Sequence, residues 1–214
     1  MNSHPWLQAT IQVEYYPDIP ILLWPIAEVE NFTFIRLSEK TSDREIGLII
    51  TQLIDYNEID VKDNINDCLQ EIIIHKNFRG KDKLMIAGGL QVCSIDGKVI
   101  RYGCCSGLEK WRGWLDFLQT KRSFWTGHDP SPWVEKIGNI VRVWSDGGMT
   151  SIKDAFYIDF ELQEFELALE QVSQDLKAFL LRLESWANQL GFPASKQLVS
   201  KFDFCFSISS PTSY

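Results

Sequence analysis

A long apolar stripe near the end of the sequence most strongly restricts the fold of this 214-residue chain. Large apolar side chains recur there at alternating steps of three and four residues, at Leu162, Phe165, Leu169, Val172, Leu176, Phe179, Leu183, Trp186 and Leu190. That spacing places them on one face of an α-helix. Gly191 and Pro193 then provide a stop signal. We therefore expect one long helix over residues 162–190 that buries its stripe against a sheet, with a coiled-coil pair as the alternative.

Segments with the alternating pattern of β-strands account for much of the remaining chain. We expect strands over residues 11–15, 21–24, 32–37, 140–144, 156–160 and 202–208. The β-branched run Ile46–Leu53 predicts a further strand, with a buried helix as the alternative. Asp96-Gly97 between two apolar runs predicts a hairpin.

Two shorter helices are expected from stripes at three- and four-residue steps over residues 61–76 and 108–118. Strands and helices do not alternate regularly, which favours an α+β fold over a doubly wound one. We expect a largely antiparallel sheet packed against one long C-terminal helix and shorter helices. No linker rich in Pro, Gly or Ser divides the chain, so residues 1–214 are expected to form a single domain.

The charge and the cysteine usage exclude several classes of protein. The formal net charge is −8, with a net −8 over residues 1–70, +4 over residues 71–150 and −4 over residues 151–214. Such an acidic chain is a poor general binder of nucleic acid, because phosphate contacts need clustered Lys and Arg. Five cysteines without repeated spacing do not predict a disulfide framework. The first residues lack the pattern of a signal peptide, and no apolar run is long enough for a membrane span, so we expect a cytoplasmic protein with no membrane partner.

The segment most unusual in composition lies between residues 103 and 144, which hold five of the eight tryptophans. Its loop from Trp125 to Trp133 contains two turn signals, Asp129-Pro130 and Ser131-Pro132. Tryptophan is frequent among the anchor residues of interfaces, and loops carry function more often than other segments. We expect Trp125, His128, Asp129 and Trp133 to form a binding surface, with a lid over the core as the structural alternative.

A catalytic role for the same region is the rival hypothesis. Cys104 or Cys105 could act as a nucleophile with His128 as its base, if folding brought them together. A metal site is not expected, because Cys104, Cys105, His128 and Asp129 show no CxxC or HxxxH spacing. No cofactor is expected either. A small-molecule binder with an aromatic-lined pocket is a third hypothesis.

Several of these segments resemble uncharacterised bacterial families, some of which are grouped with immunity proteins of polymorphic or contact-dependent toxin systems. The segments are Gly88-Gly89, Cys104-Cys105 followed by Leu108, Trp111 and Trp114, and the loop Trp125–Pro132. The resemblance covers roughly residues 84–144. It implies a small cytoplasmic α+β protein that binds and neutralises a cognate toxin. We therefore expect a non-catalytic binding protein with a protein partner.

Overall fold

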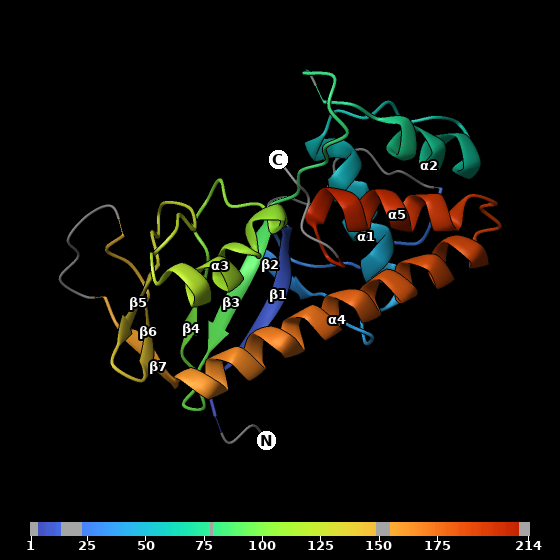
Figure 1. Cartoon of the computed structure of the whole chain (residues 1–214). Helices are drawn as coiled ribbons and strands as arrows, with labels where there is room; N and C mark the ends of the chain where they lie inside the picture. Colours follow the sequence, from blue (N-terminus) through green and yellow to red (C-terminus); the bar gives the residue numbers. More distant parts are fainter. Residues whose placement is uncertain (1–3, 14–22, 78, 149–154, 210–214) are drawn as a thin grey trace. The chain divides into compact units, whose positions relative to one another are not determined.

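The computed structural model describes residues 4–13, 23–77, 79–148 and 155–209 (Figure 1). The chain divides into two compact units, Met1–Thr10 with Ala87–Gln174 and Ile11–Ile86 with Asp175–Tyr214. One strand and one helix contribute residues to both units. The expected single domain over residues 1–214 stays a prediction.

The secondary structure confirms an α+β fold with antiparallel sheets and one long C-terminal helix. The strands are β1 (Trp6–Val13), β2 (Thr33–Arg36), β3 (Gly88–Cys93), β4 (Val99–Ile100), β5 (Trp133–Ile137), β6 (Ile140–Trp144) and β7 (Tyr157–Glu161). The helices are α1 (Asp43–Tyr56), α2 (Ile65–Ile74), α3 (Gly113–Thr120), α4 (Leu162–Gln189) and α5 (Ser195–Phe206), with a 3-10 turn at Leu108–Lys110. None of the helices in the described residues is both long and apolar enough to cross a membrane.

The strands form two sheets. One has the order β2-β1-β3-β4 and the other the order β5-β6-β7. The predicted hairpin at Asp96-Gly97 is confirmed, since it joins the antiparallel strands β3 and β4 and Gly97 has a φ of 86°. Strands near residues 11–15 and 32–37 are confirmed as β1 and β2, although residues 14 and 15 lie outside the described residues. The strand expected over residues 21–24 lies partly outside them, and Leu23 and Trp24 are not in a strand.

Helix α4 matches the prediction closely at both ends, and its apolar stripe is buried from Phe165 to Trp186. In the first unit Phe165 is its main anchor. The Phe165 ring lies 5.2 Å from that of Phe160 on β7, and 6.1 and 6.3 Å from those of Trp114 and Phe117 on α3. Burial of this stripe therefore joins α3, β7 and the start of α4 into one core.

The β5-β6-β7 sheet has one face in that core and one face outside it. Val143 pairs with Val134 and Ile158, and all three side chains are buried. The preceding residue on β6, Arg142, points to the other face, because successive side chains alternate across a strand. There it donates two hydrogen bonds of 2.8 Å to Asp159 and stacks on Tyr157. The bidentate contact with Asp159 raises the pKa of Arg142 above its usual range.

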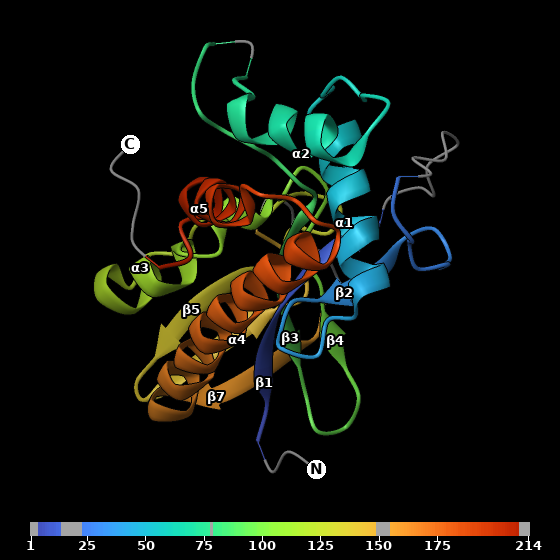
Figure 2. The same ribbon diagram turned by 90° about the vertical axis from the view of Figure 1, so that its right-hand side faces the viewer.

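The second unit has its own aromatic core. The Trp24 ring meets that of Trp186 on α4 edge to face at 5.5 Å, and its Nε1 donates to the Gly47 carbonyl on α1. Phe202 on α5 lies 6.1 Å from Phe179 on α4. Helix α5 also contacts α2, and the two can be followed in Figures 1 and 2.

The strand predicted for residues 202–208 is wrong, because Phe202 to Phe206 belong to helix α5. Phe202 and Phe206 are buried and Phe204 is exposed, whereas a strand would place all three side chains on the same face. The burial instead fits a helix: the buried positions of α5 are Ser195, Leu198, Lys201, Phe202, Cys205 and Phe206. Steps of three and four recur through that set, so the residues before Phe202 decide for the helix.

The strand predicted for Ile46–Leu53 is also wrong, and the buried-helix alternative is confirmed as α1. Every residue from Ile46 to Ile54 is buried, so the helix needs no polar face over this stretch. Ser42 starts the helix with a capping box: its hydroxyl accepts from the Glu45 amide, and the Glu45 carboxylate accepts from the Ser42 amide. This local signal outweighs the strand preference of the isoleucines.

A buried lysine in the second unit makes its stability depend on pH. Lys201 donates hydrogen bonds of 2.8 Å to the His75 carbonyl and 3.0 Å to Asp82 Oδ1. The hydrogen bond and charge of Lys201 hold the pKa of Asp82 below its ordinary value of 3.8. Because the folded pKa is lowered, the ionised carboxylate stabilises the fold above pH 3.8, and this contribution is lost as the pH falls through the folded value.

Asp82→Asn is therefore expected to reduce the decrease in unfolding free energy that accompanies acidification. Urea unfolding between about pH 5 and pH 2 measures it, as the slope of unfolding free energy against pH. Lys201→Met should flatten the slope in the same way, because it removes the partner of the carboxylate. An unchanged slope in both variants would show that this pair does not contribute to acid unfolding.

Candidate functional site

The functional candidates of the sequence meet where the loop after α3 returns to the segment that follows β4. Gly103 donates its amide to the Thr126 carbonyl at 3.0 Å. Cys104 and His128 exchange both backbone hydrogen bonds, at 2.7 and 3.2 Å, as an isolated antiparallel bridge. Directly opposed residues of such a pair carry side chains on the same face. The bridge therefore brings together two side chains that are 24 residues apart in the sequence.

Two glycines allow this close approach. A Cβ on Gly103 would lie 2.0 Å from the Pro130 oxygen and 2.5 Å from the backbone nitrogen and oxygen of His128. Gly127 has a φ of 104°, and a Cβ there would lie 2.6–2.7 Å from backbone atoms of Gly103. Real Cβ atoms do not approach backbone so closely. The two segments can therefore pair only because neither position has a side chain.

Cys104, Cys105 and His128 form the chemical centre of the site. Cys104 Sγ lies 2.9 Å from His128 Nδ1 and 3.6 Å from Nε2. One ligand atom from each of the three residues lies within 4.8 Å of the other two. Neither cysteine is in a disulfide bond and both are exposed, whereas Cys68, Cys93 and Cys205 are buried. The structure thus joins the three residues of the catalytic hypothesis, and their position on the surface keeps them accessible.

The backbone of Cys105 is in a conformation that a residue with a side chain rarely adopts, with a φ of 60°. Left-handed conformations of this kind cost of the order of 1 kcal/mol or more outside glycine. Lys110 supports the turn, because its Nζ donates to the Cys105 carbonyl at 3.1 Å. The fold thereby holds Cys105 next to Cys104 with its thiol towards the same cluster.

Asp129 is adjacent to the cluster but does not complete a catalytic relay. Its Oδ2 lies 3.3 Å from His128 Nδ1, and its side chain is almost fully exposed. A relay needs the thiol on one ring nitrogen of the histidine and the carboxylate on the other. Here Cys104 and Asp129 both have their shortest contact with Nδ1, so they compete for the same nitrogen.

Trp125 is the largest exposed side chain at the site, with 42% of its surface accessible. Its ring lies 6.4 Å from that of His128. Lys110 Nζ sits 3.8 Å from the ring centroid, in the geometry of a cation–π contact. Lys110 therefore fixes both Trp125 and the Cys105 turn. No sequence pattern indicates this role, because Lys110 is an ordinary charged residue of a short 3-10 turn.

Trp133 has a different environment from the other predicted binding residues. It begins β5 and pairs with Trp144 on β6, which pairs in turn with Tyr157 on β7. The two indoles are stacked, with centroids 6.1 Å apart and planes 6° apart. Trp133 is thus one end of an aromatic ladder across the three-stranded sheet, and it is half-buried there.

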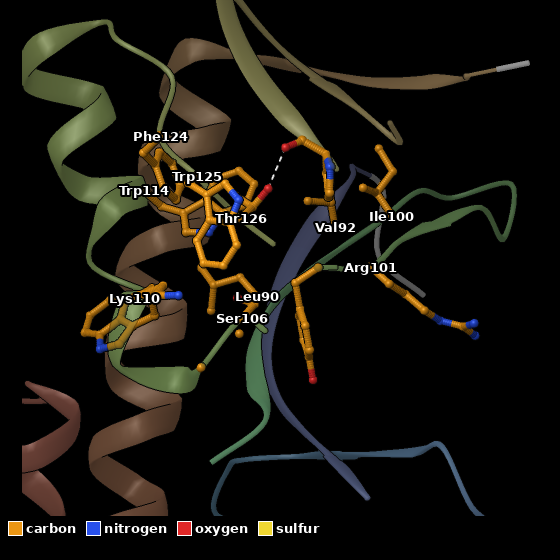
Figure 3. Close-up of a pocket in the computed structure, with 15 residues that line it drawn as sticks. Leu90, Val92, Ile100, Arg101, Ser106, Lys110, Trp114, Phe124, Trp125 and Thr126 are labelled. Atoms are coloured by element: carbon orange, nitrogen blue, oxygen red, sulfur yellow. Dashed lines mark hydrogen bonds between the residues drawn. The ribbon is translucent and has the colours of Figure 1, made fainter. Parts of the chain in front are cut away.

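A small cavity borders the site without containing its thiols. Its lining includes Tyr102, Lys110, Trp114, Phe124, Trp125 and Thr126 (Figure 3). The volume available to the centre of a water molecule in this cavity is about 10 Å³, which is roughly enough for one water. Cys104, Cys105 and His128 are not among its lining residues. The cavity has aromatic walls, as the small-molecule hypothesis requires, but no room for a metabolite in this structure.

Comparison with protein-family models, with curated proteins and with solved structures gave no match. The functional argument therefore rests on the geometry of the site.

Proposed function

We propose that this chain is a non-catalytic, cytoplasmic binding protein that engages a protein partner through one surface. We define the Trp125 surface as Cys104, Cys105, Lys110, Trp125, His128 and Asp129. The observation that carries the proposal is an exposed indole on a loop whose backbone is hydrogen-bonded directly after it, at Thr126 and at His128.

Fixed geometry favours binding because little conformational entropy is lost when the partner arrives. The Thr126 side chain is buried and donates to the Pro132 carbonyl, so the loop is also closed on itself. Lys110 already orients Trp125 in the free protein. A large, pre-oriented aromatic side chain is the usual anchor of an interface, and charged neighbours such as Lys110 and Asp129 suit its rim.

Two features favour binding over catalysis at this surface. Cys104 and Asp129 compete for one nitrogen of His128, which leaves no relay for a nucleophile. The thiols are also exposed and lie outside the cavity, so the cavity would not shield a reaction at them from water. The partner that the family resemblance implies is a toxin domain, and we propose it as the first partner to test.

Replacing Trp125 by alanine is expected to weaken partner binding by about 30-fold or more, the loss of an interface anchor worth about 2 kcal/mol. A photo-crosslinking amino acid at position 125 identifies the partner, and calorimetry with both purified proteins gives the Kd. Phe204→Ala is the matched control, because Phe204 is an exposed aromatic residue (54%) on α5 that belongs to the other unit and is not part of the Trp125 surface. Equal losses in the two variants, or none in either, would contradict the proposal.

A further inference from the structure

We propose that Cys104, Cys105 and His128 form a zinc site in this chain. The proposal is independent of any protein partner, because all three ligands come from one chain and one unit. Neither the spacing of the cysteines nor that of the histidine reveals such a site in the sequence. The ligand set exists only after the backbone bridge between Cys104 and His128 has formed.

The spacing of the donor atoms fits one zinc ion. Zinc bonds of about 2.3 Å to sulfur and 2.0 Å to nitrogen in a tetrahedron leave ligand atoms roughly 3.5 Å apart. The atoms here lie 2.9 Å apart for Cys104 Sγ and His128 Nδ1, and within 4.8 Å for the whole set. Changes of about 1 Å or less per pair close the site. The exposed side chains of Cys104 and Cys105 achieve these changes in distance by small rotations about their side-chain bonds.

The backbone of the site is already in place. Adjacent cysteines seldom share one zinc ion without strain, and the left-handed φ of Cys105 is a strain that the fold already holds. Cys104 and His128 are fixed by the bridge. Zinc binding therefore does not have to order these segments, and more of its binding free energy appears as affinity.

The chemistry of the donors selects the metal. Two thiolates and an imidazole suit zinc, whereas magnesium and calcium prefer carboxylate, carbonyl and water oxygens. We infer that Nδ1 of His128 is the ligating nitrogen, because it is the one nearest to Cys104 Sγ. Asp129 Oδ2 lies 3.3 Å from the same nitrogen, but among the described residues only Cys104, Cys105 and His128 have ligand atoms within 4.8 Å of one another, so water would fill the fourth coordination position.

The test uses the full chain, reduced and freed of metal, titrated with Co²⁺ alone and then with Zn²⁺. Tetrahedral Co²⁺ bound by thiolates has intense visible bands and a near-ultraviolet charge-transfer band. We expect both to saturate at one ion per chain and to disappear when Zn²⁺ displaces the Co²⁺. Zinc binding should release about two protons, one from each thiol, which calorimetry in buffers of different ionisation enthalpy measures.

We expect a loss of zinc affinity of about 100-fold or more in each of three variants, Cys104→Ser, Cys105→Ser and His128→Gln. Even the substitution of a residue that only orients a metal ligand typically lowers metal affinity by about 10–100-fold. Cys93→Ala and His75→Gln remove a cysteine and a histidine outside the cluster and should leave affinity unchanged. Thermal unfolding without metal verifies that every variant is folded. Asp129→Asn should lower affinity less than the three ligand substitutions.

Three outcomes would overturn the proposal. The first is a Co²⁺ spectrum without the thiolate band, which would show oxygen ligation elsewhere. The second is full affinity in His128→Gln, which would leave a dithiol site without the imidazole. The third is no binding by the wild-type chain. None of these measurements involves the protein partner. A negative result for zinc binding therefore does not contradict partner binding through Trp125, and a negative result for partner binding does not contradict the zinc site.

Discussion

Alanine in place of Phe165 is expected to lower the free energy of unfolding by about 3–5 kcal/mol, the usual cost of removing a fully buried phenylalanine ring. Phe165 has no exposed surface, and its ring faces those of Phe160, Trp114 and Phe117. The substitution leaves a cavity where α3, β7 and α4 meet. These neighbours belong to separate elements of a rigid core, so they fill the cavity only in part.

Urea or guanidinium unfolding at neutral pH measures the loss. Leu167→Ala is the matched control, because Leu167 lies on the same helix two residues later and is 57% exposed. Its unfolding free energy should change by no more than about 0.5 kcal/mol. A loss below about 1 kcal/mol for Phe165→Ala would show that the start of α4 is not packed as described.

Alanine at Gly103 is expected to separate the Trp125–Trp133 loop from the Cys104 segment. The new Cβ would overlap the Pro130 oxygen and the backbone of His128, none of which belongs to a flexible side chain that can move aside. Overpacking of this kind costs about 1–3 kcal/mol when the neighbours can shift, and more when they cannot. We expect a loss at the upper end of that range, together with rupture of the bridge.

Hydrogen exchange of two amides measures the rupture directly. The Cys104 and His128 amides donate to each other's carbonyls, so both should lose their protection in Gly103→Ala. Gly127→Ala should do the same. Its matched control is Gly97→Ala, since Gly97 also has a positive φ, 86°, but has nothing within 4 Å of a new Cβ. Protection that survives in Gly103→Ala, or is lost equally in Gly97→Ala, would refute the steric argument.

The elements that the sequence predicts well are those whose pattern is long enough to exclude the alternative. The stripe that predicts helix α4 has nine apolar positions at helical steps, eight of them inside the helix, and no strand accommodates that spacing. Residues 202–206 show only three phenylalanines at steps of two, which a helix also accommodates if Phe204 is exposed. The strand prediction for Ile46–Leu53 is wrong for a related reason. A helix that is buried on all sides has no polar face, so its sequence shows no helical alternation of polar and apolar residues.

The residues of the site could be named from the sequence, but their geometry could not. Cys104, Cys105 and His128 are conspicuous as residue types, yet their meeting depends on a backbone bridge between segments 24 residues apart. That bridge requires the contact between Gly103 and Gly127, which no local pattern predicts. Lys110 was missed altogether. Trp133 was grouped with Trp125 because both bracket one loop, whereas its side chain belongs to the ladder of the sheet.

The contact between Gly103 and Gly127 also has an evolutionary consequence. A side chain at Gly103 would overlap Pro130 and His128, and one at Gly127 would overlap the backbone of Gly103, so substitution at either position is harmful even when the other is unchanged. Homologues of this chain that retain the bridge should therefore retain a Gly-Cys pair and a Gly-His pair at the same separation. Trp125 and Asp129 should instead vary with the protein partner. The two dipeptides together form a search pattern that finds the site in chains whose other residues have diverged.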